Sequence, residues 1–284
     1  MNNILVTGGC GFIGFNLVCE LTKQNHKIVV IDKKIKNKIQ NVIYINSSTS
    51  NKEYWESELN NLNFIPDTVF HLGEYSKVTP SFTDSKNILD SNYIGTFNVV
   101  EYCKDKNIKI VYAASSTKHS EDSGNESPYA FSKKKNVELI KNYSEWFGLK
   151  YAITYFYNNY GPKQDTCGDG WETVVSIFEK QKNMGKPLTI VSPGTQRRIF
   201  THVYDTVNGL IKAWKRNESD EYQLTGNDEC SIIDLAKMFE CKYELVDKRK
   251  GESKRIIKKD LVNYTKIVLN WKPEHKLKDW ITKL

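Results

Sequence analysis

The sequence has few of the residues that hold metals or close disulfide frameworks. Among its 284 residues are 5 histidines and 6 cysteines, and the cysteines stand at positions 10, 19, 103, 167, 230 and 241. No two cysteines form a C-x-x-C pair and none lies at zinc-site spacing from a histidine, so we expect no metal site. Such cysteines suit a reducing compartment, and we predict a cytoplasmic protein.

Long apolar runs and concentrated positive charge are also absent. No apolar stretch approaches the ~18 residues of a membrane span, and we expect neither a span nor a signal peptide. The 41 Lys and Arg against 34 Asp and Glu give a net charge of +7. Because the lysines are scattered and no arginine-rich arm occurs, this excess indicates a solvated surface with a basic cleft for an anionic substrate. We predict no nucleic-acid and no membrane partner.

A glycine-rich turn follows the first aliphatic run, residues 4–7. The spacing Gly8-x-x-Gly11-x-x-Gly14 permits a tight strand-to-helix turn, close approach of a pyrophosphate, and close packing of the helix on the strand. The helix N-terminus then offers free N–H groups to phosphate. The alternative is a glycine-rich turn in an α/β domain that binds nothing. We expect Phe12 and Ile13, between the last two glycines, to take part in the cofactor site.

A carboxylate ends the second aliphatic run. Asp32 follows residues 28–31 and stands 24 residues after Gly8, where it can bind both ribose hydroxyls of NAD and would repel the 2′-phosphate of NADP. Lys33 comes next and weakens that preference, because a lysine can neutralise such a phosphate. NAD is therefore the expected cofactor, with NADP less favoured.

Alternation of short aliphatic runs with helical periods over about 160 residues predicts an α/β fold with a doubly wound parallel sheet. In such sheets ligands bind beyond the carboxyl ends of the strands. The rhythm changes from residue 163, which indicates a smaller C-terminal α/β substrate lobe. We assign residues 1–162 to an NAD-binding Rossmann domain to which 198–215 return, and residues 163–197 and 216–284 to the lobe.

A tyrosine and a lysine stand one helical turn apart on a predicted helix. Tyr129 and Lys133 share a face at this i,i+4 spacing. A phenol has a pKa of about 10 and is a poor base, but a lysine ammonium and a positive nicotinamide ring nearby favour the phenolate. Ser115, at the end of the preceding strand, can share a proton with it, so the set can deprotonate a secondary alcohol as hydride leaves. The alternative is a chance pairing on a helix surface.

Together these features resemble the extended short-chain dehydrogenase/reductases of the NAD-dependent epimerase/dehydratase family. The matching segments are Gly8-Gly9-Cys10-Gly11-Phe12-Ile13-Gly14, Phe70-His71-Leu72-Gly73, Asn92 with Gly95, Ser115 with Tyr129 and Lys133, Phe156-Tyr157-Asn158-Asn159-Tyr160-Gly161-Pro162, Gly194-Thr195-Gln196-Arg197-Arg198, and Arg249-Lys250-Gly251-Glu252.

The resemblance implies further roles. Leu72, Gly73 and Asn92 would join the cofactor site. The substrate would be a nucleotide-diphosphate sugar, whose phosphates Asn158, Arg198 and Arg249 would bind and whose ribose Glu252 would bind. Ser116, Thr117 and Lys77 are placed near the sugar. A homodimer is expected, with helices at 85–106 and 129–146 forming a four-helix bundle.

Departures from the family pattern narrow the reaction. After the catalytic serine the 4,6-dehydratases carry Asp-Glu and the decarboxylases carry Ser-Glu. This chain has Ser116 and Thr117 there, with no acid, so elimination lacks its proton donor. Glu74 and Lys77 replace the usual residues after the fourth strand, and they either touch nicotinamide or sugar or are loop charges. We therefore predict a 4-epimerase of UDP-hexoses that acts through a 4-keto intermediate. An NAD(P)H-dependent 4-keto-sugar reductase and, less favoured, a non-catalytic dinucleotide-binding protein are the alternatives.

Overall fold

A seven-stranded parallel sheet forms the centre of the computed structural model, which describes residues 1–119, 127–164, 172–247 and 258–284. The strand order is β10-β6-β5-β4-β1-β2-β3. The strands are β1 Asn3–Thr7, β2 Lys27–Asp32, β3 Val42–Asn46, β4 Thr68–His71, β5 Lys109–Ser115, β6 Tyr151–Phe156 and β10 Asp220–Leu224. The central strands are mostly buried and rich in apolar residues because helices cover both faces of the sheet. This arrangement confirms the predicted doubly wound fold.

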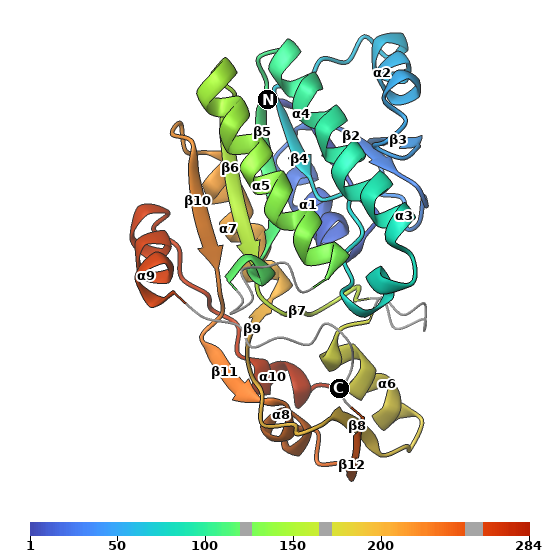
Figure 1. Cartoon of the computed structure of the whole chain (residues 1–284), viewed down its shortest axis with the longest axis vertical. Coiled ribbons are helices and arrows are strands. Elements are labelled where there is room, and N and C mark those ends of the chain that lie inside the picture. Colours follow the sequence, from blue (N-terminus) through green and yellow to red (C-terminus); the bar gives the residue numbers. More distant parts are fainter. Residues whose placement is uncertain (120–126, 165–171, 248–257) are drawn as a thin grey trace.

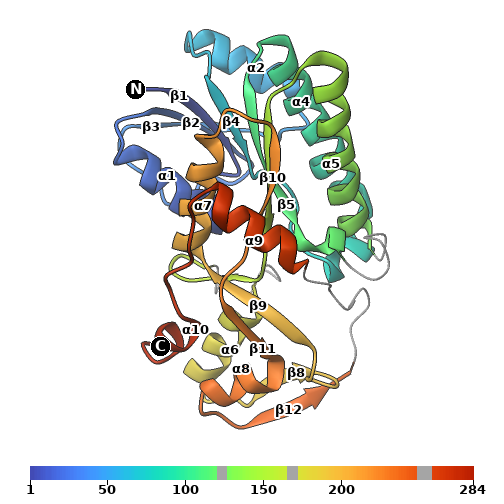
Figure 2. The same ribbon diagram turned by 90° about the vertical axis from the view of Figure 1, so that its left-hand side faces the viewer.

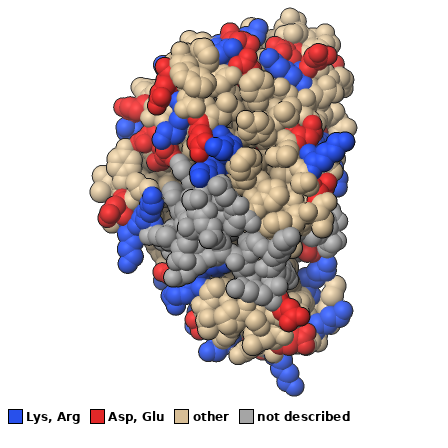
Figure 3. Space-filling model, in the orientation of Figure 1, with Lys and Arg blue, Asp and Glu red and all other residues tan. Residues whose placement is uncertain are grey.

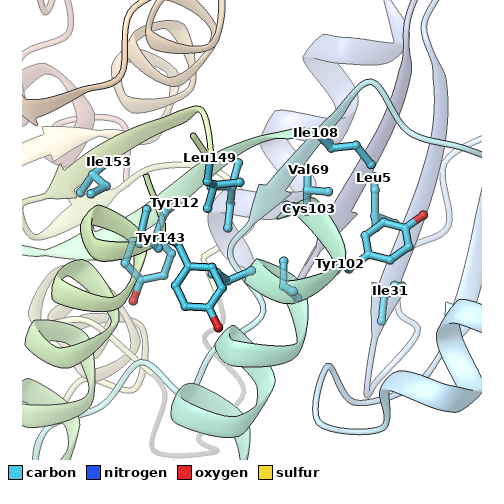
Figure 4. Packing of buried hydrophobic residues seen from close by; sticks show 14 of the residues in the cluster. Leu5, Ile31, Val69, Tyr102, Cys103, Ile108, Tyr112, Tyr143, Leu149 and Ile153 are labelled. Carbon is cyan, nitrogen blue, oxygen red and sulfur yellow. The ribbon is translucent and has the colours of Figure 1, made fainter. Parts of the chain in front are cut away.

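Two helical layers cover the sheet (Figure 2). One contains α2 Lys52–Asn61, α3 Ser85–Ile88, α4 Gly95–Asp105 and α5 Pro128–Phe147, and the other contains α1 Phe12–Thr22 and α7 Val203–Trp214. Figure 4 shows part of the core beneath the first layer, where side chains of the sheet meet those of α4 and α5. A second core lies between the sheet and α1 and α7, and Trp271 from the C-terminal region completes it.

The helix expected over residues 85–106 is present but is not uniform. A π-helical segment, η2 Leu89–Ile94, joins α3 to α4. π-Helical turns inside α-helices frequently occur at functional sites, because they change the direction in which a side chain points. Here the segment carries Asn92 toward the interior of the domain, where its side chain is fully buried.

The smaller lobe follows the carboxyl ends of the main strands (Figure 1). It contains the three-stranded sheet β11-β9-β7 and the two-stranded sheet β12-β8. Its elements are β7 Asn159–Tyr160, α6 Val174–Asn183, β8 Leu188–Val191, β9 Arg197–His202, β11 Asp228–Ser231, α8 Ile232–Met238, β12 Tyr243–Val246 and α10 Leu277–Ile281. A third hydrophobic core, which includes Phe178, Leu235 and Phe239, holds these elements together. The predicted C-terminal α/β lobe is therefore present.

The division at residue 216 needs one correction. Residues 220–224 form β10, which pairs with β6 in parallel and is the edge strand of the main sheet rather than part of the lobe. Helix α9 Lys259–Val268 packs beside β10. A five-residue strand whose partner lies 68 residues earlier carries no local signal of that partner. The return to the Rossmann domain thus includes α7, β10 and α9, whereas residues 198–202, which the sequence assigned to that return, belong to β9 in the lobe sheet.

Surface and composition agree with the expected solvated exterior. Lysine and arginine side chains are interspersed with aspartate and glutamate over the face shown in Figure 3. Among the described residues, no helix combines the length and apolar character that crossing a membrane requires.

Truncation of one core side chain tests the packing of α5 on the sheet. Ile140 on α5 is 0% exposed, whereas Ile267 on α9 is 78% exposed. We expect Ile140→Ala to lower the free energy of unfolding by about 2–5 kcal/mol, the usual cost of a buried isoleucine-to-alanine change. Ile267→Ala is the matched control and should change it by less than about 0.5 kcal/mol. Urea denaturation followed by circular dichroism measures both, and equal effects would contradict this packing.

Candidate active site

The glycine-rich turn has the shape that a bound pyrophosphate needs. Gly8 has φ +70°, and a Cβ there would lie 2.7 Å from the backbone of Gly73. A Cβ on Gly14 would lie 2.1 Å from the carbonyl oxygen of Gly8, so helix α1 could not approach the turn with a larger residue. Helix α1 has no side-chain cap at Gly11 and no acidic residue in its first turn. Its N–H groups and positive dipole end therefore suit an anion.

Asp32 lies beside this turn at the end of β2. Its carboxylate accepts hydrogen bonds of 3.0 Å from the backbone N–H groups of Cys10 and Lys34. Burial raises the pKa of Asp32, and those backbone hydrogen bonds act in the opposite direction. The two N–H groups hold the carboxylate at the sheet edge next to the glycine turn, which is the position required for binding ribose hydroxyls.

The turn and the carboxylate together fit NAD. Gly8 and Gly14 allow the turn and helix α1 to pack closely, the N-terminus of α1 at Gly11 carries no side-chain cap and so can face a diphosphate, and Asp32 supplies the acceptor for the ribose. Phe12 and Ile13 begin α1 and pack partly against the core, whereas Lys33 is exposed. Across the sheet, Leu72 and Gly73 follow β4. The backbone N–H of Leu72 donates to the carbonyl of Thr7, which places this segment directly beside the turn.

The three predicted catalytic residues converge at the carboxyl end of β5. Ser115 ends that strand, and Tyr129 and Lys133 lie in the first turns of α5; all three side chains are buried. The helix begins here because the hydroxyl of Ser127 accepts a 3.1 Å hydrogen bond from the N–H of Ala130, with proline at the first helical position. Sequence reasoning therefore correctly placed these residues at one edge of the sheet.

The ammonium of Lys133 is held from two sides. It donates to the carbonyl oxygen of Ala113 on β5 at 2.5 Å and forms an ion pair with Glu74. It also lies 4.9 Å from the centre of the Tyr112 ring, within cation–π range. This geometry excludes one alternative for Glu74, a solvated loop charge, because its side chain is 2% exposed and pairs with Lys133. Its contact with nicotinamide or sugar stays a prediction.

A polar network surrounds the Glu74 carboxylate. The hydroxyls of Thr96 and Tyr112 donate to it at 2.6 and 3.0 Å, and the amide of Asn136 donates at 2.7 Å. Sequence reasoning missed this network. The available signals were an acid directly after β4 and an asparagine three residues after Lys133, but neither reveals its partners on other elements.

His71 extends the network toward the glycine turn. Its ring nitrogens are 2.7 Å from the hydroxyl of Thr7 and 2.9 Å from that of Thr96. Burial lowers the pKa of His71 to about 4, although the nearby Glu74 opposes this. The imidazole is therefore neutral at pH 7, donating to one hydroxyl and accepting from the other. Burial also raises the pKa of Tyr112 well above its usual value, and the Glu74 carboxylate adds to that effect.

Asn92 occupies a structural position behind the site. Its side chain bonds both backbone groups of Tyr75 and donates to the hydroxyl of Ser132, which in turn donates to the carbonyl of Tyr129. Asn92 thus links the segment after β4 to the helix that carries Tyr129. The contact of Asn92 with the cofactor, which the resemblance implies, stays a prediction.

A cavity of about 290 Å³ between the lobe and the ends of the main strands brings together three predicted substrate residues, Lys77, Asn158 and Arg198. Asn158 has φ +31° and donates to the carbonyl of Ile199. Lys77 donates to the backbone carbonyl of Glu172 at 2.6 Å.

The remaining predicted substrate residues fall into two groups. Ser116 and Thr117 are buried directly after β5, and the Thr117 hydroxyl has no hydrogen-bond partner within the described residues. Such a buried hydroxyl is available to a bound ligand. Arg249 and Glu252 lie outside the described residues. Within those residues, no group of three His, Cys, Asp or Glu side chains is arranged to hold a metal.

Removal of the Asp32 charge tests the ribose contact. We expect Asp32→Asn to weaken NAD binding about tenfold or more, since a hydrogen bond to a charged group contributes ~1.5–3 kcal/mol. The preference for NAD over NADP should also shrink. Asp67→Asn is a matched control, because Asp67 likewise accepts a backbone N–H, from Asn3, but precedes β4 at the opposite edge of the sheet. Titration calorimetry with both nucleotides measures this, and unchanged NAD affinity in the Asp32 variant would contradict the assignment.

Comparison with known proteins matches the chain to a family model and to curated relatives. The model of the NAD dependent epimerase/dehydratase family matches residues 4–224. A putative UDP-glucose 4-epimerase of Methanocaldococcus jannaschii is 30% identical over 311 aligned positions, covering 99% of this chain and 96% of that protein. UDP-glucuronic acid decarboxylase 3 of Arabidopsis thaliana is 26% identical, over 97% of this chain and 86% of that protein.

The fold also matches a solved structure. The UDP-glucose 4-epimerase of Thermotoga maritima, determined with UDP-glucose, superimposes with a TM-score of 0.86 at 23% identity, over 98% of this chain and 96% of that one. The family uses NAD, and the turn and Asp32 described above fit that cofactor. With a family model that matches most of its length, the chain belongs to the NAD dependent epimerase/dehydratase family.

Proposed function

We propose that this protein is an NAD-dependent 4-epimerase of nucleotide-diphosphate sugars, most favourably UDP-hexoses. The observation that carries the proposal is the convergence of Ser115, Tyr129 and Lys133 at the end of β5, followed by two hydroxyl residues rather than an acid. A site with a base for an alcohol and no side-chain acid for elimination suits reversible oxidation at C4.

The chain's residues would act on the sugar hydroxyl. Tyr129, with Lys133 one turn away, takes the C4 proton, and Ser115 shares it through a hydroxyl hydrogen bond. Bound NAD supplies the chemistry of accepting and returning the C4 hydride. Lys77, Asn158 and Arg198 line the neighbouring cavity, which would hold the diphosphate. Rotation of the 4-keto sugar about that diphosphate then presents its opposite face.

The residues after Ser115 favour epimerisation over the other activities named among the relatives. The decarboxylase and dehydratase patterns carry an acid where this chain has Ser116 and Thr117. The Thr117 hydroxyl, buried and without a partner in the described residues, is placed to bind the sugar but is too weak an acid to drive elimination. On this ground UDP-glucuronic acid should undergo epimerisation or no reaction, and not decarboxylation.

A 4-keto-sugar reductase is the second candidate, because the same residues can deliver a proton while NAD(P)H delivers hydride. An epimerase leaves its cofactor unchanged and bound after turnover, whereas a reductase consumes one reduced nucleotide for each product. The amount of nicotinamide oxidised per product therefore distinguishes the two. A non-catalytic dinucleotide-binding protein would show neither change.

Removal of one phenol hydroxyl tests the chemistry. We expect Tyr129→Phe to lower the rate of epimerisation by about 10²–10⁴, the usual contribution of a general base. Tyr143→Phe is the control, since Tyr143 lies on the same helix but donates to Glu101, away from the site. Products from UDP-, dTDP-, GDP- and CDP-hexoses are followed by NMR. Full epimerisation by the Tyr129 variant would contradict the mechanism.

We also propose a homodimer formed through η2, α4 and α5. Leu89, Tyr93 and Phe97 repeat every four residues and are exposed, and Trp146 at the end of α5 is 62% exposed. An apolar stripe of this kind on adjacent helices is typical of a surface that pairs with another helical layer. The family resemblance supplies the same expectation of a four-helix bundle.

A charge placed in that stripe tests the dimer. We expect the protein to sediment as a dimer and Phe97→Glu to sediment as a monomer, because a buried unpaired carboxylate opposes association. Ile267→Glu, at a more exposed position on α9, should remain dimeric. A monomeric unmodified protein at micromolar concentration would refute the proposal.

We propose a cytoplasmic location as well. The five described cysteines, at positions 10, 19, 103, 230 and 241, are free thiols, the state that a reducing compartment maintains.

A further inference from the structure

The buried carboxylate of Glu74 lies in the same network as the catalytic lysine. The groups that face it come from every element packed around it. They are Thr96 from α4, Tyr112 from β5, and Lys133 and Asn136 from α5, with the His71 ring nitrogen at 3.9 Å. Of these titratable neighbours, His71 is neutral near pH 7 and Tyr112 is a phenol that burial keeps protonated. Lys133 is the cation that balances the carboxylate.

Side-chain donors from three elements surround the Glu74 carboxylate. Thr96, Tyr112 and Asn136 each donate to a carboxylate oxygen. Donors of this number replace the hydration that a buried anion loses. Contacts from α4, β5 and α5 therefore fix the position of the Glu74 carboxylate.

The position of Lys133 follows from that anion. The ammonium lies between the Glu74 carboxylate and the carbonyl of Ala113, one helical turn from Tyr129. A cation at this place favours the phenolate of Tyr129, and an anion paired with the cation opposes the same ionisation. The two charges thus act on the phenol with opposite sign.

We propose that Glu74 is a positioning residue that holds Lys133 at the end of β5 and, by offsetting its charge, sets the pH at which Tyr129 becomes an active base. The proposal rests on the proposed function, because it takes Tyr129 as the base. With Glu74 paired to Lys133, Tyr129 should become an active base at a higher pH than it would beside an unpaired lysine.

The direct test measures the ionisation of Tyr129 without measuring turnover. The near-ultraviolet absorbance of phenolate is titrated with pH in the NAD-bound protein, and the same titration of Tyr129→Phe is subtracted to isolate this phenol. Glu74→Gln removes the charge and keeps the shape. We expect the midpoint to fall by about one pH unit, since a unit charge within ~10 Å in a partly buried site has an effect of that size.

Glu221→Gln is the matched control. Glu221 on β10 also pairs with a lysine of α5, Lys141, and also accepts a tyrosine hydroxyl, that of Tyr155. Lys141 lies eight residues after Lys133, about 12 Å along the helix. This variant should leave the midpoint unchanged. Glu74→Asp keeps the charge and should keep the midpoint, although the shorter side chain loosens the network.

A double variant covers the case in which Glu74→Gln does not fold. Glu74→Gln with Lys133→Met removes both charges and leaves no unpaired ion in the interior. If Glu74 offsets Lys133, the midpoint of the double variant stays within about half a pH unit of the unmodified protein. A rise of more than one unit would show that Lys133 acts alone and would overturn the proposal.

The outcomes separate this inference from the proposed function. An unshifted midpoint in folded Glu74→Gln, or equal losses of rate in the Gln and Asp variants at every pH, would reduce Glu74 to a packing residue. Where epimerisation is observed, the acid limb of kcat/KM should move with the phenol midpoint. If no nucleotide sugar is turned over, the proposed function fails, but the phenol titration still decides the role of Glu74.

Discussion

The geometry of the candidate active site depends on the ion pair between Glu74 and Lys133, which is buried where α5 packs near the ends of β4 and β5. Moving a charged group from water into the protein interior costs desolvation free energy. Removing one partner of a buried ion pair therefore destabilises a protein by about 3–5 kcal/mol, because the other charge is left unpaired. The pair is tolerated because four further polar groups, on α4, β5 and α5, complete its hydrogen bonding. The same contacts fix the turn of α5 that carries Tyr129. Stability and chemistry therefore depend on one set of contacts.

This network also connects the glycine turn to helix α5, the two parts of the proposed cofactor site. Thr7, just before the glycine turn, bonds His71, and His71 bonds Thr96, which donates to Glu74. The chain of contacts runs from β1, which leads into the glycine turn, to α5, which carries Tyr129. A neutral His71 is required for this pattern, because it must accept from one hydroxyl while donating to the other. Protonation of His71 on acidification would break it.

The sequence allowed the fold to be predicted because its signals are local. Strands β1 and β2 follow from the aliphatic runs at 4–7 and 28–31, and the shared helix face of Tyr129 and Lys133 follows from a four-residue spacing. What could not be predicted depends on partners far apart in the chain. The pairing of β10 with β6 and the insertion of Glu74 beneath α5 both arise from tertiary packing. Neither residue type nor spacing distinguishes a buried acid from a loop charge until the surrounding donors are known.

Reversible oxidation at C4 is the central claim, and an isotope-retention experiment tests it most directly. A UDP-hexose carrying deuterium at C4 is converted in ordinary water, and the product is examined by NMR. If hydride leaves C4 and returns from the same bound nicotinamide, the product with inverted C4 keeps its deuterium there and the solvent contributes no hydrogen. Appearance of solvent hydrogen at C4, or inversion that proceeds with the label transferred to free nucleotide, would contradict the account.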